Sequence, residues 1–335
     1  MPPNPAHRRV FAVLGVALAA VSFAAIFIRW ADAPGVVVAL YRMLVAAAVM
    51  APLTRRGLRR TPFTRVGART TLLAGVMLAL HFATWITSLT YTTVAASVSL
   101  AATAPLWVAL LAWAFQRRPP SALTLLGALI AVAGAAVIGY ADAGAASGSA
   151  ASGSAASGGA VSGGAVSGGA VSGGAAGGRP LLGDGLALTG AAAAGAYLLL
   201  GRHAQAHGLG LQAYAGSAYA VAALVLAPLP LVVGAPYLGY PSATYLAVIA
   251  LALVPQLVGH TGINYAAKHL DTTLVASALL LEPIGAGLLA LLLFREQPAP
   301  LTVVGAAVLL VGVAVTSRAQ AQRRPRAREA RAAGR

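Results

Sequence analysis

An apolar run near the end of the chain carries one carboxylate, Glu282, which is followed directly by Pro283. A carboxylate inside a membrane is costly, and a proline inside a helix removes a backbone hydrogen bond. Together they predict an interrupted helix that lines something more polar than lipid. An unpaired carboxyl group in apolar surroundings favours its neutral form, so Glu282 could exchange a proton or contact a substrate. The alternative is a structural role, in which a protonated Glu282 bonds a carbonyl freed by Pro283.

Arg42 is the only other strongly charged residue that we expect well inside an apolar run. Its predicted depth is about 12 Å from the outer start of its helix, and that of Glu282 is about 15 Å into its own helix. The two groups could therefore form an ion pair. The alternative is an arginine that extends along its helix to the outer headgroups.

Other polar and aromatic side chains recur at helical spacing inside the apolar runs, so each set shares one helix face. Such faces point to a bundle interior or a cavity rather than to lipid, although hydrogen bonding between helices without a substrate explains them equally well. The sets are His81, Trp85 and Ser88; Ser99, Thr103 and Trp107; Gln256, His260 and Asn264; and Thr273 with Ser277.

The composition requires a membrane around these residues. The 335-residue chain is 59% hydrophobic and 9% charged, against about 25% charged in a soluble domain. There is no cysteine, which excludes disulfide, thiolate and iron–sulfur chemistry. The net charge of +16 comes from arginines between and after the apolar runs rather than on one face, so no nucleic-acid partner is expected.

The sequence predicts an all-α polytopic membrane protein with ten transmembrane helices. Each is about 20 residues long, enough to span about 30 Å of hydrocarbon. Most of the 23 lysines and arginines fall on the side of the N-terminus, which predicts cytoplasmic termini in the inner (plasma) membrane. The predicted helices cover residues 10–30, 34–53, 71–89, 94–115, 122–140, 181–200, 212–233, 243–262, 272–293 and 301–316.

Four segments follow from this layout. Residues 1–140 form a first five-helix repeat, and residues 141–180 form a flexible linker of Gly, Ser, Ala and Val outside the cell. Residues 181–317 form a second five-helix repeat, and residues 318–335 form a basic cytoplasmic tail.

The two halves align with each other without a gap over their fourth and fifth helices. Five helices per half is an odd number, so the halves would have opposite orientations, as in the inverted repeats of many secondary transporters. The alternative is an old duplication whose helices now only pack against each other and have no role in transport. The rarer matched residues are Pro105 with Pro283, Arg117 with Arg295, Gly127 with Gly305, and Gly134 with Gly312.

His81 and His260 fall at nearly equivalent positions of the two halves. Histidine titrates near physiological pH, so proton handling is one role for them. No carboxylate is near them in sequence, and no metal site is expected.

Several short motifs carry a resemblance to a known family. The chain resembles the EamA-type transporters of the drug/metabolite transporter superfamily, over roughly residues 10–140 and 181–317. The resemblance implies ten helices and the export of small metabolites or toxic compounds, with the proton gradient as the expected driving force. The motifs are Tyr41-Arg42, Thr103-Ala104-Pro105, Asn264-Tyr265-Ala266 with Lys268, Ser277, Leu281-Glu282-Pro283 and Arg295-Glu296.

A non-transporting membrane protein (a receptor, a scaffold or an intramembrane enzyme) is the alternative to a transporter. The predicted spans hold no aspartate pair, so an enzyme is not expected, and no Walker-type phosphate loop occurs. The expected partners are a small-molecule substrate, the lipid bilayer and protons, without a cofactor. The sequence leaves a monomer and a homodimer open.

Overall fold

A computed structural model describes residues 5–116, 119–154, 179–269 and 278–333, and within these ranges the regular structure is entirely helical. The first half contains α1 (Pro5–Ser22), α2 (Ala24–Trp30), α3 (Gly35–Arg60), α4 (Arg65–Ser88), α5 (Val94–Ala101), α6 (Ala104–Gln116) and α7 (Ala122–Ser154). The second half contains α8 (Pro180–Ala206), α9 (Leu211–Leu226), α10 (Leu229–Val232), α11 (Ser242–Leu251), the π-helix η1 (Ala252–His260), α12 (Thr261–His269), α14 (Leu281–Phe294) and α15 (Pro300–Ala333).

Eight helical stretches in the described part of the chain are long and apolar enough to cross a membrane. Two shorter apolar helices, Leu281–Phe294 and Pro300–Thr316, stand where the ninth and tenth spans are predicted. The predicted ninth span begins at residue 272, outside the described residues. The chain is therefore a polytopic helical membrane protein, and the count of ten spans remains a prediction.

The apolar stretches Val94–Ala114, Ala122–Ala141 and Pro300–Thr316 agree with the predicted spans 94–115, 122–140 and 301–316, but the helices that contain them differ from the predicted ranges in detail. The predicted fourth helix is two helices, because α5 ends at Ala101 and α6 begins at Ala104, just before Pro105. α7 continues to Ser154, past residue 140, where the linker is predicted to start. Alanine is the strongest helix former, and the alanines after residue 140 extend α7. Likewise α15 runs on to Ala333 through the alanine- and arginine-rich tail.

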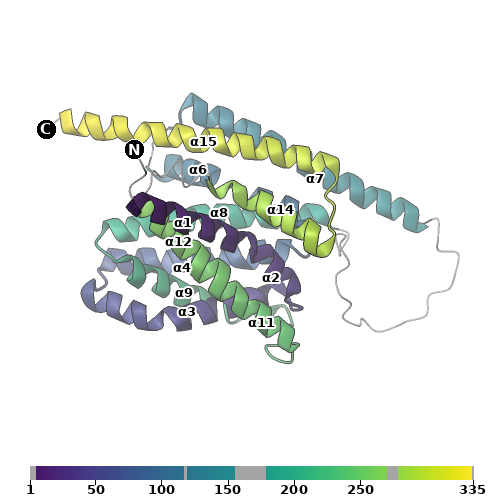
Figure 1. The fold of residues 1–335 in the computed structure, drawn as a ribbon, viewed down its shortest axis with the longest axis horizontal. Helices are drawn as coiled ribbons and strands as arrows, with labels where there is room; N and C mark the ends of the chain where they lie inside the picture. Colours follow the sequence, from purple (N-terminus) through teal and green to yellow (C-terminus); the bar gives the residue numbers. More distant parts are fainter. Residues whose placement is uncertain (1–4, 117–118, 155–178, 270–277, 334–335) are drawn as a thin grey trace.

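The two halves pack into one bundle rather than into two separate units (Figure 1). The most extensive contacts join a helix of one half to a helix of the other: α3 and α4 pack on α9, α4 packs on α8, and α7 packs on α15. In the same way α1 packs on η1, α12 and α14. Both chain termini lie at one end of the bundle (Figure 1).

The contact between α7 and α15 is made through glycines. A Cβ on Gly134 would lie 2.7 Å from the carbonyl oxygen of Gly305, and a Cβ on Gly305 would lie 2.9 Å from that of Gly134. Gly127 and Gly312 are opposed in the same reciprocal way, at 2.7 and 2.6 Å. Small residues of this kind let helix backbones approach closely in membranes. Since numbers rise along one helix as they fall along the other, α7 and α15 run antiparallel (Figure 1).

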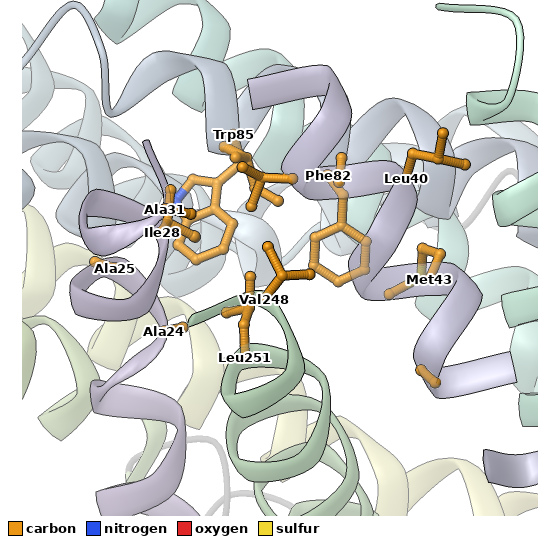
Figure 2. Packing of buried hydrophobic residues seen from close by; sticks show 14 of the residues in the cluster. Ala24, Ala25, Ile28, Ala31, Leu40, Met43, Phe82, Trp85, Val248 and Leu251 are labelled. Carbon is orange, nitrogen blue, oxygen red and sulfur yellow. The ribbon is translucent and has the colours of Figure 1, made fainter. Parts of the chain in front are cut away.

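The largest apolar cluster lies where helices of both halves meet. Part of it is drawn in Figure 2: Phe82 and Trp85 of α4 lie with Val248 and Leu251 of α11 and with Ile28 of α2. This cluster buries one side of α4 and leaves the adjacent side, which carries His81, for other contacts.

Arg295 ends α14 in a left-handed backbone conformation, with φ of 54°, and it is the only non-glycine residue with positive φ among those described. The next residue, Glu296, donates its N–H to the carbonyl of Ala290 (3.3 Å), which ties the chain to the last turns of α14. This turn directs Glu296 back into the bundle, where its side chain is buried.

Replacing Arg295 with glycine is expected to raise the free energy of unfolding by roughly 0.5–1 kcal/mol, because glycine adopts positive φ without the Cβ clash of other residues. Arg295→Val should lower it, since a branched Cβ makes the clash worse. Thermal melting of the purified protein in detergent measures both, and a lower melting temperature for Arg295→Gly would contradict the argument.

Candidate functional site

A fully buried arginine lies at the centre of the polar residues. The side chain of Arg42, on α3, is 0% exposed. It donates from Nε (3.0 Å) and Nη2 (2.7 Å) to the side-chain oxygen of Gln256. Its guanidinium carbon lies 4.1 Å from the ring centroid of Phe82, a cation–π distance. The alternative in which Arg42 extends to the outer headgroups is therefore wrong.

The partner of Arg42 belongs to an unusual helix. Gln256 lies in η1, whose nine residues Ala252–His260 are π-helical and include Pro255. π-Helical turns are rare and occur often at functional sites. The hydroxyl of Tyr219, on α9, lies close to the Gln256 side chain. Residues from three helices of the two halves thus meet at one amide group.

Glu282 lies in the first turn of α14, directly after the turn at Leu280. The N-terminal end of a helix carries partial positive charge, which stabilises a carboxylate placed there. Glu282 is within electrostatic reach of Arg42, but no direct ion pair joins these two described residues within 4.0 Å. The predicted contact is therefore an interaction through space in this conformation.

The two histidines approach the same centre from different helices. His81, on α4, contacts the carbonyl oxygen of Gly190 through Nδ1 (2.9 Å) and stacks on Trp85 with an interplanar angle of 2°. His260, the last residue of η1, is within electrostatic reach of both Arg42 and His81. The part of the chain that is described contains no group of three or more His, Cys, Asp or Glu residues arranged to hold a metal ion.

The predicted stripe Ser99, Thr103 and Trp107 does not form one helix face, because the chain is interrupted between α5 and α6. Ser99 is buried in α5, and the Thr103 hydroxyl donates to the carbonyl of Leu100 (2.6 Å). Trp107 packs on Gly195 of α8. No described contact joins these three residues to Arg42.

Of the remaining candidates, Thr273, Ser277 and the side chain of Asn264 lie outside the described part of the structure.

A second buried polar cluster lies where α2 and α14 end, at the end of the bundle opposite the termini (Figure 1). Arg29 and Glu296 form an ion pair with Nη1 and Oε2 3.1 Å apart, and their side chains are 12% and 5% exposed. Arg29 also donates to the carbonyl of Thr92 (3.0 Å), and Glu296 accepts from the N–H of Val94 (2.7 Å). The cluster joins the two halves of the chain.

Sequence reasoning missed three members of these clusters. Tyr219 and Phe82 lie in apolar runs, where aromatic rings read as ordinary core residues. Arg29 lies near the predicted end of its helix, where a positive charge is normally interpreted as setting the orientation of the helix in the membrane. A signal for this pair was present in the two opposite charges, Arg29 and Glu296, both predicted at outer helix ends.

The fold and the buried charges define the class: a polytopic helical membrane protein whose two halves share one polar centre. The sequence pattern of the EamA-like transporter family matches residues 9–140 and 181–318. The chain therefore belongs to the EamA-like transporter family, which confirms the resemblance, and it is a membrane transporter of the drug/metabolite transporter superfamily.

One solved structure supports the fold. A chain described only as "Crystal structure of protein" aligns with a TM-score of 0.56 at 18% identity, over 94% of this chain and 98% of its own length. At this identity the likeness concerns the fold alone. No curated protein matches the chain.

Proposed function

We propose that the protein is a secondary active transporter that exports a small metabolite or drug-like compound by alternating access, with protons as the coupling ion. The observation that carries the proposal is Arg42, a fully buried charge whose partners come from both halves of the bundle. Charged residues inside membrane spans are rare and mark substrate or ion pathways. A receptor or scaffold has no need of such a group.

Alternating access fits the way in which the halves pack. The helices that hold the centre, α3 and α4 from one half and α9 and η1 from the other, contact each other across the halves. A rotation of one set against the other would change which side of the membrane reaches Arg42 and Gln256. The antiparallel pairing of α7 with α15 supports an inverted repeat, the architecture in which two such states are related by symmetry.

Glu282 is the proposed proton carrier. It lies at the start of α14, beside the interruption at Leu280. It interacts electrostatically with Arg42 but does not form an ion pair with it. A carboxyl group in that position can bind a proton or release it when cargo binds or when the site opens to the other side of the membrane. The same proposal places the protein in the inner membrane with both termini in the cytoplasm, following the distribution of basic residues.

Proton movement in liposomes tests the coupling. Purified protein would be reconstituted with an internal pH dye and given a panel of amino acids and cationic drugs. We expect a substrate-dependent pH change with the native chain and a signal at the level of empty liposomes with Glu282→Gln, which keeps the shape and removes the charge. Asp32→Asn, at an exposed carboxylate between α2 and α3, is the matched control and should behave as the native chain.

The other possible results of the liposome experiment would contradict separate parts of the proposal. A pH change that survives in Glu282→Gln would remove this residue from the coupling. Uptake of a labelled compound without any pH change in the native chain would contradict protons as the coupling ion. A chain that moves no compound in either direction would favour the alternative of a non-transporting membrane protein.

A further inference from the structure

No group of the described residues that contacts Arg42 directly neutralises its charge. Its partners are a neutral amide oxygen and an aromatic ring, and the one ion pair within 4.0 Å among the described residues is that of Arg29 with Glu296. Arg42 is nevertheless completely buried. An unpaired buried charge costs several kcal/mol, and a ligand that brought an opposite charge to Arg42 would offset part of that cost.

The guanidinium group of Arg42 also has N–H donors that its described partners do not use. Its Nη1 atom is buried and has no hydrogen-bond partner among the described residues. Arginine presents its donors in a planar fork that matches the two oxygens of a carboxylate or a similar oxyanion. Nε and Nη2 are occupied by Gln256, which fixes the plane of the fork and leaves Nη1 for a further acceptor.

Glu282 does not fill this role in the described conformation. It lies at the start of α14, where the helix end itself favours a negative charge, and it reaches Arg42 only through space. The two histidines near the centre add no negative charge. The apolar cluster with Phe82 and Trp85 lies directly beside the guanidinium.

We infer that Arg42 forms an anion subsite, which binds the carboxylate or equivalent oxyanion of an amphipathic cargo whose apolar part lies toward Phe82. This inference rests on the proposed function, because it names the class of group that the cargo presents. Gln256 is the positioning residue that orients the fork.

The absence of cysteine from the chain allows a test that needs no knowledge of the cargo. A single reporter, His260→Cys, would be labelled with an anionic (sulfonatoethyl) and a cationic (trimethylammonioethyl) methanethiosulfonate, each rate being normalised to that of a free thiol. A unit charge at a separation on the order of 10 Å, at an effective dielectric constant of about 20, changes the local concentration of a unit ion by about tenfold. We therefore expect labelling to prefer the anion by about tenfold or more.

Two variants and a second reporter make the test specific. Arg42→Gln should abolish the preference at His260→Cys, whereas Arg42→Lys, which keeps the charge, should retain most of it. Thr90→Cys, at an exposed position outside the site, should show no preference in any background. If Arg42→Gln does not fold, the comparison of the two reporters in the native background still decides the question.

An equal rate for both reagents at His260→Cys would overturn the inference, and so would no labelling at all, because a cargo subsite must be reachable. Labelling in neutral detergent with and without phosphatidylglycerol separates cargo from lipid. A preference that disappears when this anionic lipid is added would assign the fork to a headgroup and overturn the cargo role. Failure of transport in liposomes would leave the labelling result unaffected, so the two proposals fail separately.

Discussion

Glu296→Ala is expected to lower the free energy of unfolding by about 3–5 kcal/mol, the range observed when one partner of a buried ion pair is removed. The variant leaves Arg29 unpaired in a site where its side chain is only 12% exposed. It also removes the acceptor of the Val94 N–H. Detergent-induced unfolding followed by tryptophan fluorescence measures the loss.

Two further variants separate charge burial from simple loss of a carboxylate. Asp32→Ala removes an exposed carboxylate and should change stability by no more than about 0.5 kcal/mol. Arg29→Met combined with Glu296→Leu should recover most of the loss, since replacing both partners of a buried pair by apolar residues is often neutral. A loss below about 1 kcal/mol for Glu296→Ala would show that water reaches the pair.

Gly134→Leu is expected to destabilise the bundle by about 3 kcal/mol, the upper part of the range for overpacking. A Cβ at this position meets the backbone of α15 rather than the tip of a flexible side chain, and lies 2.7 Å from the Gly305 oxygen. The two helices must therefore move apart along their length. The same unfolding measurement applies.

The chain offers a close control for this substitution. Gly287 lies inside α14, and a Cβ added to it would meet nothing within 4 Å. Gly287→Leu should leave stability unchanged or raise it by up to about 1 kcal/mol, because leucine favours a helix over glycine. Equal losses for Gly134→Leu and Gly287→Leu would mean that the glycine contact between α7 and α15 is not tight.

The helices were predictable because a membrane imposes one strong rule, that apolar runs of about 20 residues become helices. Gly127 and Gly134 stood out because they match glycines of the second half, but their packing on α15 was not predicted. Helix ends were harder, since they depend on weak local preferences: alanine carries α7 beyond residue 140, while the chain breaks before Pro105.

The polar centre was predictable in its members but not in its contacts. Arg42, Gln256, His81 and His260 stand out as polar residues in apolar runs, and the structure gathers them. The contacts among these residues depend on how five helices cross. The spacing of residues along one helix gives no information on that crossing. The π-helical turns around Gln256 have no periodic signature that distinguishes them from an α-helix with a proline.

The interleaving of the halves has a consequence for biosynthesis. α7 ends at Ser154 and its partner α15 starts at Pro300, so translation at about 5–20 residues per second separates them by on the order of 10–30 s. During that interval the glycine face of α7, and the face of α3 that carries Arg42, are exposed to lipid or to the insertion machinery. The first half of this protein must therefore persist in the bilayer as a loosely packed intermediate that is completed only by the helices made last.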